Sequence, residues 1–133
     1  MRFPPSTLLL ADWAARLGQD LFYPPNVGGW SGGRRWITPQ TMIGRNNYAA
    51  ALVGGSLFRT GEAFDALALP QRHGRGGSLP ELIDFYAELL HGTPPDPAWR
   101  DRLMGSVNPK ATMADTARRT VARILASPEA QLC

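Results

Sequence analysis

The stretch LFYPPNVGGWSGGRRWI, residues 21–37, most constrains what this chain can fold into. Pro24 and Pro25 fix the backbone φ angle and remove two hydrogen-bond donors, and four glycines leave the backbone free to turn. Its apolar residues follow neither a helical nor a strand period. The sequence therefore predicts a long ordered loop, rich in proline, glycine and tryptophan, between regular elements.

Strong helix start and stop signals lie on both sides of this loop. Ser, Thr or Asp precedes each apolar stretch, often with proline next, and glycine follows most of them. No segment has a convincing strand period. We predict an all-α fold with about five short helices, forming a single helical unit over residues 1–133. Caps included, the expected helices cover residues 6–18, 38–55, 78–92, 96–105 and 112–126.

Smaller features complete the expected organisation. A short helical turn is expected before Pro70, and residues 71–78 read as a polar loop. Ser127 resembles a helix start with too little chain after it for a full helix. The stripe of Leu9, Trp13 and Leu17 is expected to be exposed as an apolar patch.

Composition and charge exclude several classes of protein. Hydrophobic residues make up 44% of the 133 positions, which is typical of a globular chain, and a net charge of +3 is too weak to indicate nucleic-acid binding. Cys133 is the only cysteine, so no disulfide within the chain is possible. Asp12 and Arg16 interrupt the apolar start too soon for an export signal or a membrane span.

The helix at residues 78–92 carries a spacing that resembles a metal site. Glu88 and His91 match the Glu-x-x-His pattern of di-iron bundles, but only one copy is present. We interpret it as part of a solvated face and predict neither a metal nor a cofactor. The solvated face is expected to hold Glu81, Asp84, Glu88 and His91, and the apolar face Leu82, Phe85, Tyr86, Leu89 and Leu90.

The loop at residues 71–78 contains candidate binding residues. Arg72, His73 and Arg75 precede a helix N-terminus that could hold an anion, although a flexible surface loop is the simpler interpretation.

With two histidines and no Gly-x-Ser-x-Gly motif, the sequence does not predict an independent hydrolase, and we expect the isolated chain not to be catalytic.

The loop at residues 21–37 allows two interpretations. Trp30, Trp36 and Tyr23 could stack on sugar rings or bases. Arg34 and Arg35 could then engage acidic groups. Alternatively, the apolar residues of the loop anchor it between helices, because a long irregular segment needs contacts of its own to stay ordered. The residues expected to act as such anchors are Phe22, Val27, Trp30, Trp36 and Ile37.

The order of residues here is more informative than their composition. LGQDLFYPPNVGGWSGGRRWI resembles the signature of a bacterial family, the domain of unknown function 1800. Arg45, Asn47 and Ala49 fit the family's Arg-x-Asn-x-Ala pattern on the following helix. ILASPEAQ is similar to its closing motif, with Ala130 where an aromatic is usual. The matched positions in the first run are Leu17, Gly18, Gln19, Leu21, Phe22, Pro24, Pro25, Asn26, Val27, Gly29, Trp30, Gly32, Gly33 and Trp36.

The resemblance implies a largely helical protein of several hundred residues, often exported to the periplasm or beyond the cell. Its members have no established reaction. We therefore expect residues 1–133 to be the C-terminal fragment of a longer domain, whose N-terminal remainder or another protein is the partner. The chain itself carries no signal that fixes its location. The structural signature residues are Gln19, Phe22, Pro24, Pro25, Asn26, Gly29, Trp36, Arg45 and Asn47.

Our leading hypothesis is a non-catalytic helical module with a structural or interaction role. Asn26 and Asn47 would satisfy backbone groups of the loop, and Arg45 would brace it by hydrogen bonds. The alternative is a carbohydrate- or polymer-binding or hydrolytic site, completed by a missing N-terminal region. Buried Trp30 and Trp36 without a cleft would support the first hypothesis, whereas an exposed ring in a groove with Arg34 or Arg35 would support the second.

A third interpretation is nucleic-acid binding, which we do not expect. It requires several arginines to share one face of the molecule, because the phosphate backbone is bound by clustered positive charge. The arginines concerned are Arg34, Arg35, Arg118, Arg119 and Arg123.

Overall fold

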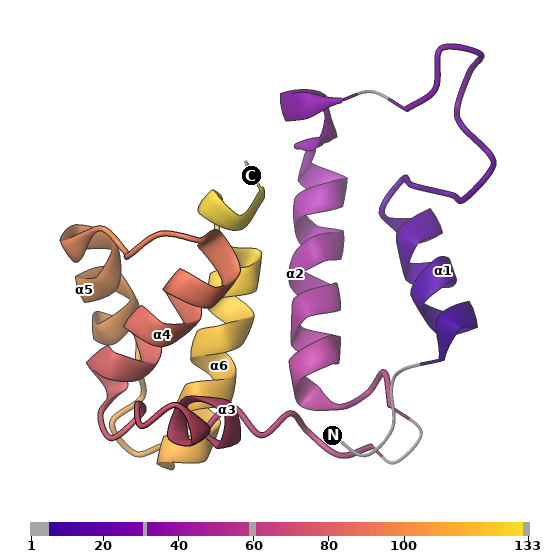
Figure 1. Cartoon of the computed structure of the whole chain (residues 1–133). Helices are drawn as coiled ribbons and strands as arrows, with labels where there is room; N and C mark the ends of the chain where they lie inside the picture. Colours follow the sequence, from indigo (N-terminus) through magenta and orange to yellow (C-terminus); the bar gives the residue numbers. More distant parts are fainter. Residues whose placement is uncertain (1–5, 31, 59–60, 132–133) are drawn as a thin grey trace.

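The computed structural model describes residues 6–30, 32–58 and 61–131. All regular structure in these ranges is helical, which confirms the all-α prediction. The elements are α1 (Thr7–Arg16), the 3-10 turn η1 (Gly33–Trp36), α2 (Pro39–Gly54), α3 (Ala68–Arg72), α4 (Leu79–His91), α5 (Pro97–Gly105), α6 (Met113–Ala126) and the 3-10 turn η2 (Glu129–Gln131), as drawn in Figure 1.

The predicted N-caps explain where most helices begin. Thr38 and Thr41 form a reciprocal capping box at α2, in which each hydroxyl accepts from the other residue's backbone N–H. Ser6 occupies the N-cap position of α1 but makes no capping bond with its side chain. The caps of α4, α5 and α6 accept a hydrogen bond from the third helical residue through Ser78, Asp96 and Thr112, respectively.

Helix α6 lies between α2 and α4, and α5 packs on the other side of α4 (Figure 1). This arrangement places the main core among α4, α5, α6 and the end of α2. The Tyr86 hydroxyl remains satisfied there, because it donates to the Ala66 carbonyl over 2.9 Å. The largest fully buried side chains are Tyr86, Leu82, Ile83, Ile124 and Pro70.

Two sequence-based expectations about this half of the chain are wrong in detail. Leu89, at 54% exposure, and Leu90 face solvent, and Ile83 and Ala87 take their place in the core of α4. The buried face of α4 is therefore formed by Leu82, Ile83, Phe85, Tyr86 and Ala87, and α5, α6 and η2 all contact this helix. Helix α3 also passes through Pro70 rather than ending before it, since a proline in the first turn removes no helical hydrogen bond.

Helix α1 packs on α2 through its own apolar stripe. The Trp13 and Tyr48 rings have centroids 5.5 Å apart, and Leu17 approaches Gly44 so closely that an added Cβ there would lie 2.8 Å from Leu17 Cδ2. Leu9, Trp13 and Leu17 are consequently half-buried, and the expectation that they form an exposed patch is wrong.

Residues 17–38, which we call the signature loop, connect α1 to α2. The loop arches outward from the ends of these two helices, on the side of α2 away from α4 and α5 (Figure 1). Its last part, η1, lies directly above the first turn of α2. The scaffold therefore presents the loop at one end of the molecule.

Candidate functional site

Two tight turns set the path of the signature loop. In the first, the Tyr23 N–H donates to the Asp20 carbonyl over 3.1 Å, with Phe22 at a φ of 68°. In the second, Asn26 Oδ1 accepts from the Gly28 N–H over 2.8 Å and the Asn26 carbonyl accepts from the Gly29 N–H. The second turn confirms that Asn26 satisfies backbone groups of the loop.

The 3-10 turn η1 brings the end of the loop back onto α2. The Ile37 N–H donates to the Arg34 carbonyl over 3.0 Å. The Thr41 hydroxyl, already part of the α2 capping box, donates to the Trp36 carbonyl. These bonds hold the Trp36 backbone against the first turn of α2, and its side chain is half-buried there.

A cleft of about 200 Å³ lies at the base of the loop. Trp30 lines it with 39% of its surface still exposed, and Arg35 is exposed beside it. Of the three ligand-binding residues expected from the sequence, the structure brings Trp30 and Arg35 together, whereas Arg34 is exposed and does not line the cleft. The lining residues are Leu17, Gly18, Pro25, Trp30, Arg35, Trp36 and Thr41.

The outer part of the loop contradicts the anchoring hypothesis. Phe22 is 92% exposed, Val27 is fully exposed, and Ile37 is also exposed. Phe22 and Val27 cannot anchor the loop between helices, because the two turns direct this segment away from α2 (Figure 1). Trp36 is the candidate anchor that the structure places partly inside.

The signature residues on α2 act elsewhere than expected. Arg45 donates to Gln131 Oε1 in η2, and Gln131 Nε2 in turn donates to the Leu125 carbonyl over 3.0 Å. The prediction that Arg45 braces the loop is therefore wrong. Asn47 lies exposed on α2, and within the described ranges its side chain makes no hydrogen bond to the loop. Sequence reasoning missed Gln131, although it belongs to the closing motif ILASPEAQ.

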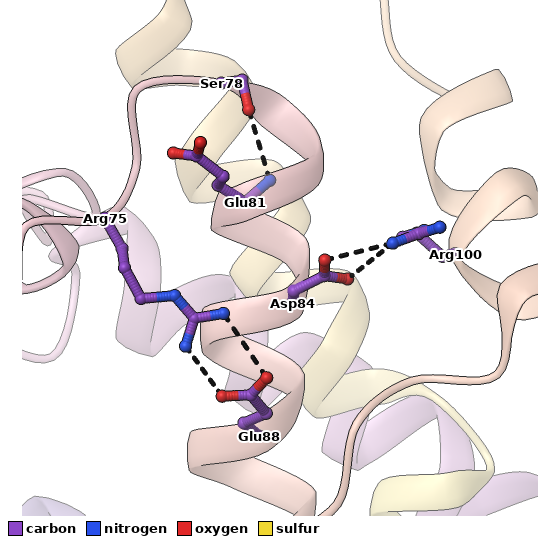
Figure 2. A network of polar contacts seen from close by, with 6 residues as sticks. All are labelled: Arg75, Ser78, Glu81, Asp84, Glu88 and Arg100. Atoms are coloured by element: carbon purple, nitrogen blue, oxygen red, sulfur yellow. Dashed lines mark hydrogen bonds and ion pairs between the residues drawn. The ribbon is translucent and has the colours of Figure 1, made fainter.

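The backbone N–H groups that could bind an anion next to residues 72–75 already have a partner within the chain. Glu81 Oε2 accepts from the Gly76 and Gly77 N–H groups over 3.2 and 3.0 Å, so the chain's own carboxylate occupies these backbone donors. Arg75 forms two hydrogen bonds with Glu88, of 2.7 and 3.4 Å (Figure 2). The hydrogen bond from Arg75 lowers the pKa of Glu88, and the same bond raises the pKa of Arg75.

Asp84 and His91 of α4 also contact neighbouring residues of the fold, although His91 Nε2 is buried without a hydrogen-bond partner among the described residues. Arg100 of α5 pairs with Asp84 over 3.1 Å (Figure 2). The His91 ring lies against Trp99, with ring centroids 5.6 Å apart. The face that resembles a metal site in sequence is therefore one that joins α4 to its neighbours by ion pairs and ring contacts.

The arginines proposed for nucleic-acid binding do not form one cluster. Arg118 and Arg119 line a hollow of about 360 Å³ beside Gly54, near the C-terminal end of α2. Arg34 and Arg35 precede the opposite end of that helix. A helix of this length spans about 24 Å, which separates the two groups by more than twice the Debye length at physiological salt.

Comparison with known protein families agrees with the signature. The profile of the family described as "Protein of unknown function (DUF1800)" matches residues 1–132. The chain belongs to this family. No curated protein and no solved structure matches the chain. Membership in DUF1800 defines no reaction, so the site must be interpreted from its own geometry. None of the described helices is long and apolar enough to cross a membrane.

Proposed function

We propose that this DUF1800 chain is a helical binding module without a reaction of its own, and that the cleft of the signature loop is its ligand site. The observation that carries the proposal is the shared exposure of Trp30 and Arg35 in one cleft with Trp36 and Pro25. A loop with only a structural role would bury its tryptophans without leaving a cleft beside them.

The size and walls of the cleft suit one ring of a larger ligand. Sites for drug-sized molecules measure about 300–1,000 Å³, whereas this cleft measures about 200 Å³. Indole faces and a proline ring provide flat apolar surfaces on which a sugar ring can pack. Because Trp30 remains partly exposed, a chain can continue beyond the bound ring. These properties support a carbohydrate or a related polymer as the ligand.

The same lining supports binding rather than hydrolysis. Its described residues contain no carboxylate, imidazole or thiol, so the cleft has no general acid or base of its own. A hydrolytic site would need such groups from outside the lining of this cleft, for example from the N-terminal remainder of a longer protein. Testing the remainder for activity separates the two possibilities.

Indole resonances in nuclear magnetic resonance spectra test the binding proposal. The chain has tryptophans at positions 13, 30, 36 and 99, which give four separate indole N–H signals. On titration with a panel of oligosaccharides, we expect the Trp30 and Trp36 signals to move. Trp13 packs on Tyr48 and Trp99 is buried in the core, so their signals serve as internal controls. Unchanged Trp30 and Trp36 signals across the panel would contradict the proposal.

A second candidate function is protein docking by the outer part of the loop. Phe22, Tyr23 and Val27 expose large apolar surfaces next to one another in sequence. The partner we propose is the N-terminal remainder of a longer DUF1800 protein or another exported protein, a setting that rests on the family resemblance.

Photo-crosslinking in cells that produce the chain together with its natural partners tests this candidate. A photoreactive phenylalanine analogue at Phe22 should form a discrete crosslinked product. The same analogue at Leu8, which is equally apolar and exposed on α1, is the matched control. Equal crosslinking from both positions would show that the loop has no docking role.

A further inference from the structure

The geometry points to a narrower ligand class for the cleft: a sugar ring that carries an oxyanion, such as a uronic acid unit of an acidic polysaccharide. This inference rests on the proposed binding function. The shared chemistry is a flat apolar ring face together with one oxyanion at its edge, and a carboxylate or a phosphate can supply that oxyanion.

Arg35 brings a positive charge to the cleft. Across the described ranges its side chain forms neither an ion pair nor a hydrogen bond, although four other arginines are paired with carboxylates. The described lining of the cleft contains no acidic residue that could take this role. A free guanidinium beside apolar walls offers parallel N–H donors that match a carboxylate or a phosphate. Arg34, its exposed neighbour, adds positive potential.

The described lining of the cleft offers few other polar side chains. Thr41 is engaged, since its hydroxyl donates to the Trp36 carbonyl and accepts from the Thr38 N–H. The remaining lining is leucine, glycine, proline and tryptophan. A neutral sugar would therefore find ring packing but few directed hydrogen bonds. An acidic sugar gains a charge-assisted bond to Arg35, so selectivity depends on this one side chain.

The charge and the packing surface of the cleft are close in the chain. Arg35 directly precedes Trp36 in η1, so the guanidinium and the half-buried indole belong to one short rigid turn. Trp30 closes the cleft from the preceding part of the loop. A ligand that presents a ring and an oxyanion together can contact both groups, whereas a small anion without a ring gains only the contact with Arg35.

Matched ligands test the inference on the whole chain. We would follow the Trp30 and Trp36 indole signals during titration with tri-galacturonate, a neutral galactose trisaccharide, a sugar phosphate and citrate. We expect the acidic trisaccharide to bind about tenfold more tightly than the neutral one. A stronger response to the sugar phosphate than to tri-galacturonate would contradict the uronic acid assignment. Arg35→Gln should abolish the preference, and Arg34→Gln should retain most of it.

The outcomes separate this inference from the proposed function. Equal binding of acidic and neutral trisaccharides would overturn the inference and leave the binding module intact. No movement of either indole with any sugar would overturn both. Citrate binding as tightly as tri-galacturonate would show that the cleft selects charge alone and would also overturn the inference. Equal losses from Arg35→Gln and Arg34→Gln would reject the assigned role of Arg35.

Discussion

At the scale of single residues, Phe22 combines a strained backbone conformation with an exposed apolar ring. It is the only described non-glycine residue with a positive φ, at 68°, and its ring is 92% exposed. The left-handed conformation costs an ordinary residue about 1–2 kcal/mol, and no buried surface compensates here. Strain of this kind is more common at functional sites, which supports the docking role proposed for the outer loop.

This conflict predicts a stabilising substitution. Phe22→Asn should raise the free energy of unfolding by about 0.5–1 kcal/mol, because asparagine tolerates the left-handed region and little apolar contact is lost. Urea unfolding measures the change. Tyr23→Asn, at the exposed neighbouring position, is the control and should shift stability by less than about 0.5 kcal/mol. A marked loss in Phe22→Asn would mean that the Phe22 ring packs against the protein.

The buried hydroxyl of Tyr86 leads us to expect a loss of stability in alkaline solution. Burial raises its pKa to about 12, and the charge of Asp65 adds to the shift. An unfolded tyrosine ionises near pH 10, so the folded state keeps its proton longer. The corresponding stability is complete below about pH 10 and is lost as the pH rises through about 12. Tyr86→Phe should reduce this loss of stability at high pH, because phenylalanine does not ionise. At lower pH the variant should be less stable than the wild type, because it lacks the hydrogen bond to the Ala66 carbonyl.

Urea unfolding at a series of pH values between 8 and about 12 measures this difference. The stabilities of the wild type and the variant should differ most at about pH 8 and converge as the pH rises. Parallel declines over the whole range would show that Tyr86 does not control alkaline stability.

At the scale of elements, the end of α2 depends on one glycine. Gly55 has a φ of 87°, and an added Cβ would lie 2.3 Å from the Glu62 carbonyl oxygen, a backbone atom. Gly55→Ala should lower the free energy of unfolding by at least about 2 kcal/mol, because both strain and a clash result. Gly54→Ala is the matched control, since that site is helical and open, and it should stabilise by up to about 1 kcal/mol. Thermal unfolding compares the two, and equal effects would contradict this account.

The elements were also the part of the fold most predictable from sequence. Thr38, Asp96 and Thr112 cap their own helices within three residues, so the cause and its effect are both local. The buried face of α4 was less predictable. Leu89 and Ile83 are both apolar and close in sequence, and which one is buried depends on where the neighbouring elements pack on α4.

At the scale of the whole molecule, the candidate site was predicted in part. Trp30 and Arg35 could be named because aromatic and basic residues in an irregular segment indicate binding. Their shared cleft could not be predicted, since it depends on how η1 folds back onto α2. The exposure of Phe22 was not predicted either, because it also depends on the path of the loop. A loop path follows from turns and tertiary contacts together, and neither is visible in a hydrophobic period.

The hydrogen bond between Arg45 and Gln131 spans the largest sequence separation among those of the described residues, and it links α2 to the turn η2. The two residues are 86 positions apart, so no local pattern indicates their pairing.

We expect the hydrogen bond between Arg45 and Gln131 to hold η2 and the first half of α2 together. Arg45→Ala and Gln131→Ala should therefore be non-additive, with a coupling of about 0.5–2 kcal/mol in urea unfolding. The control pair, Asn47→Ala with Gln131→Ala, should be additive within about 0.5 kcal/mol, because Asn47 is exposed on the same helix. Additivity in both pairs would show that the link contributes nothing to stability, and that the cleft and the closing motif are positioned independently.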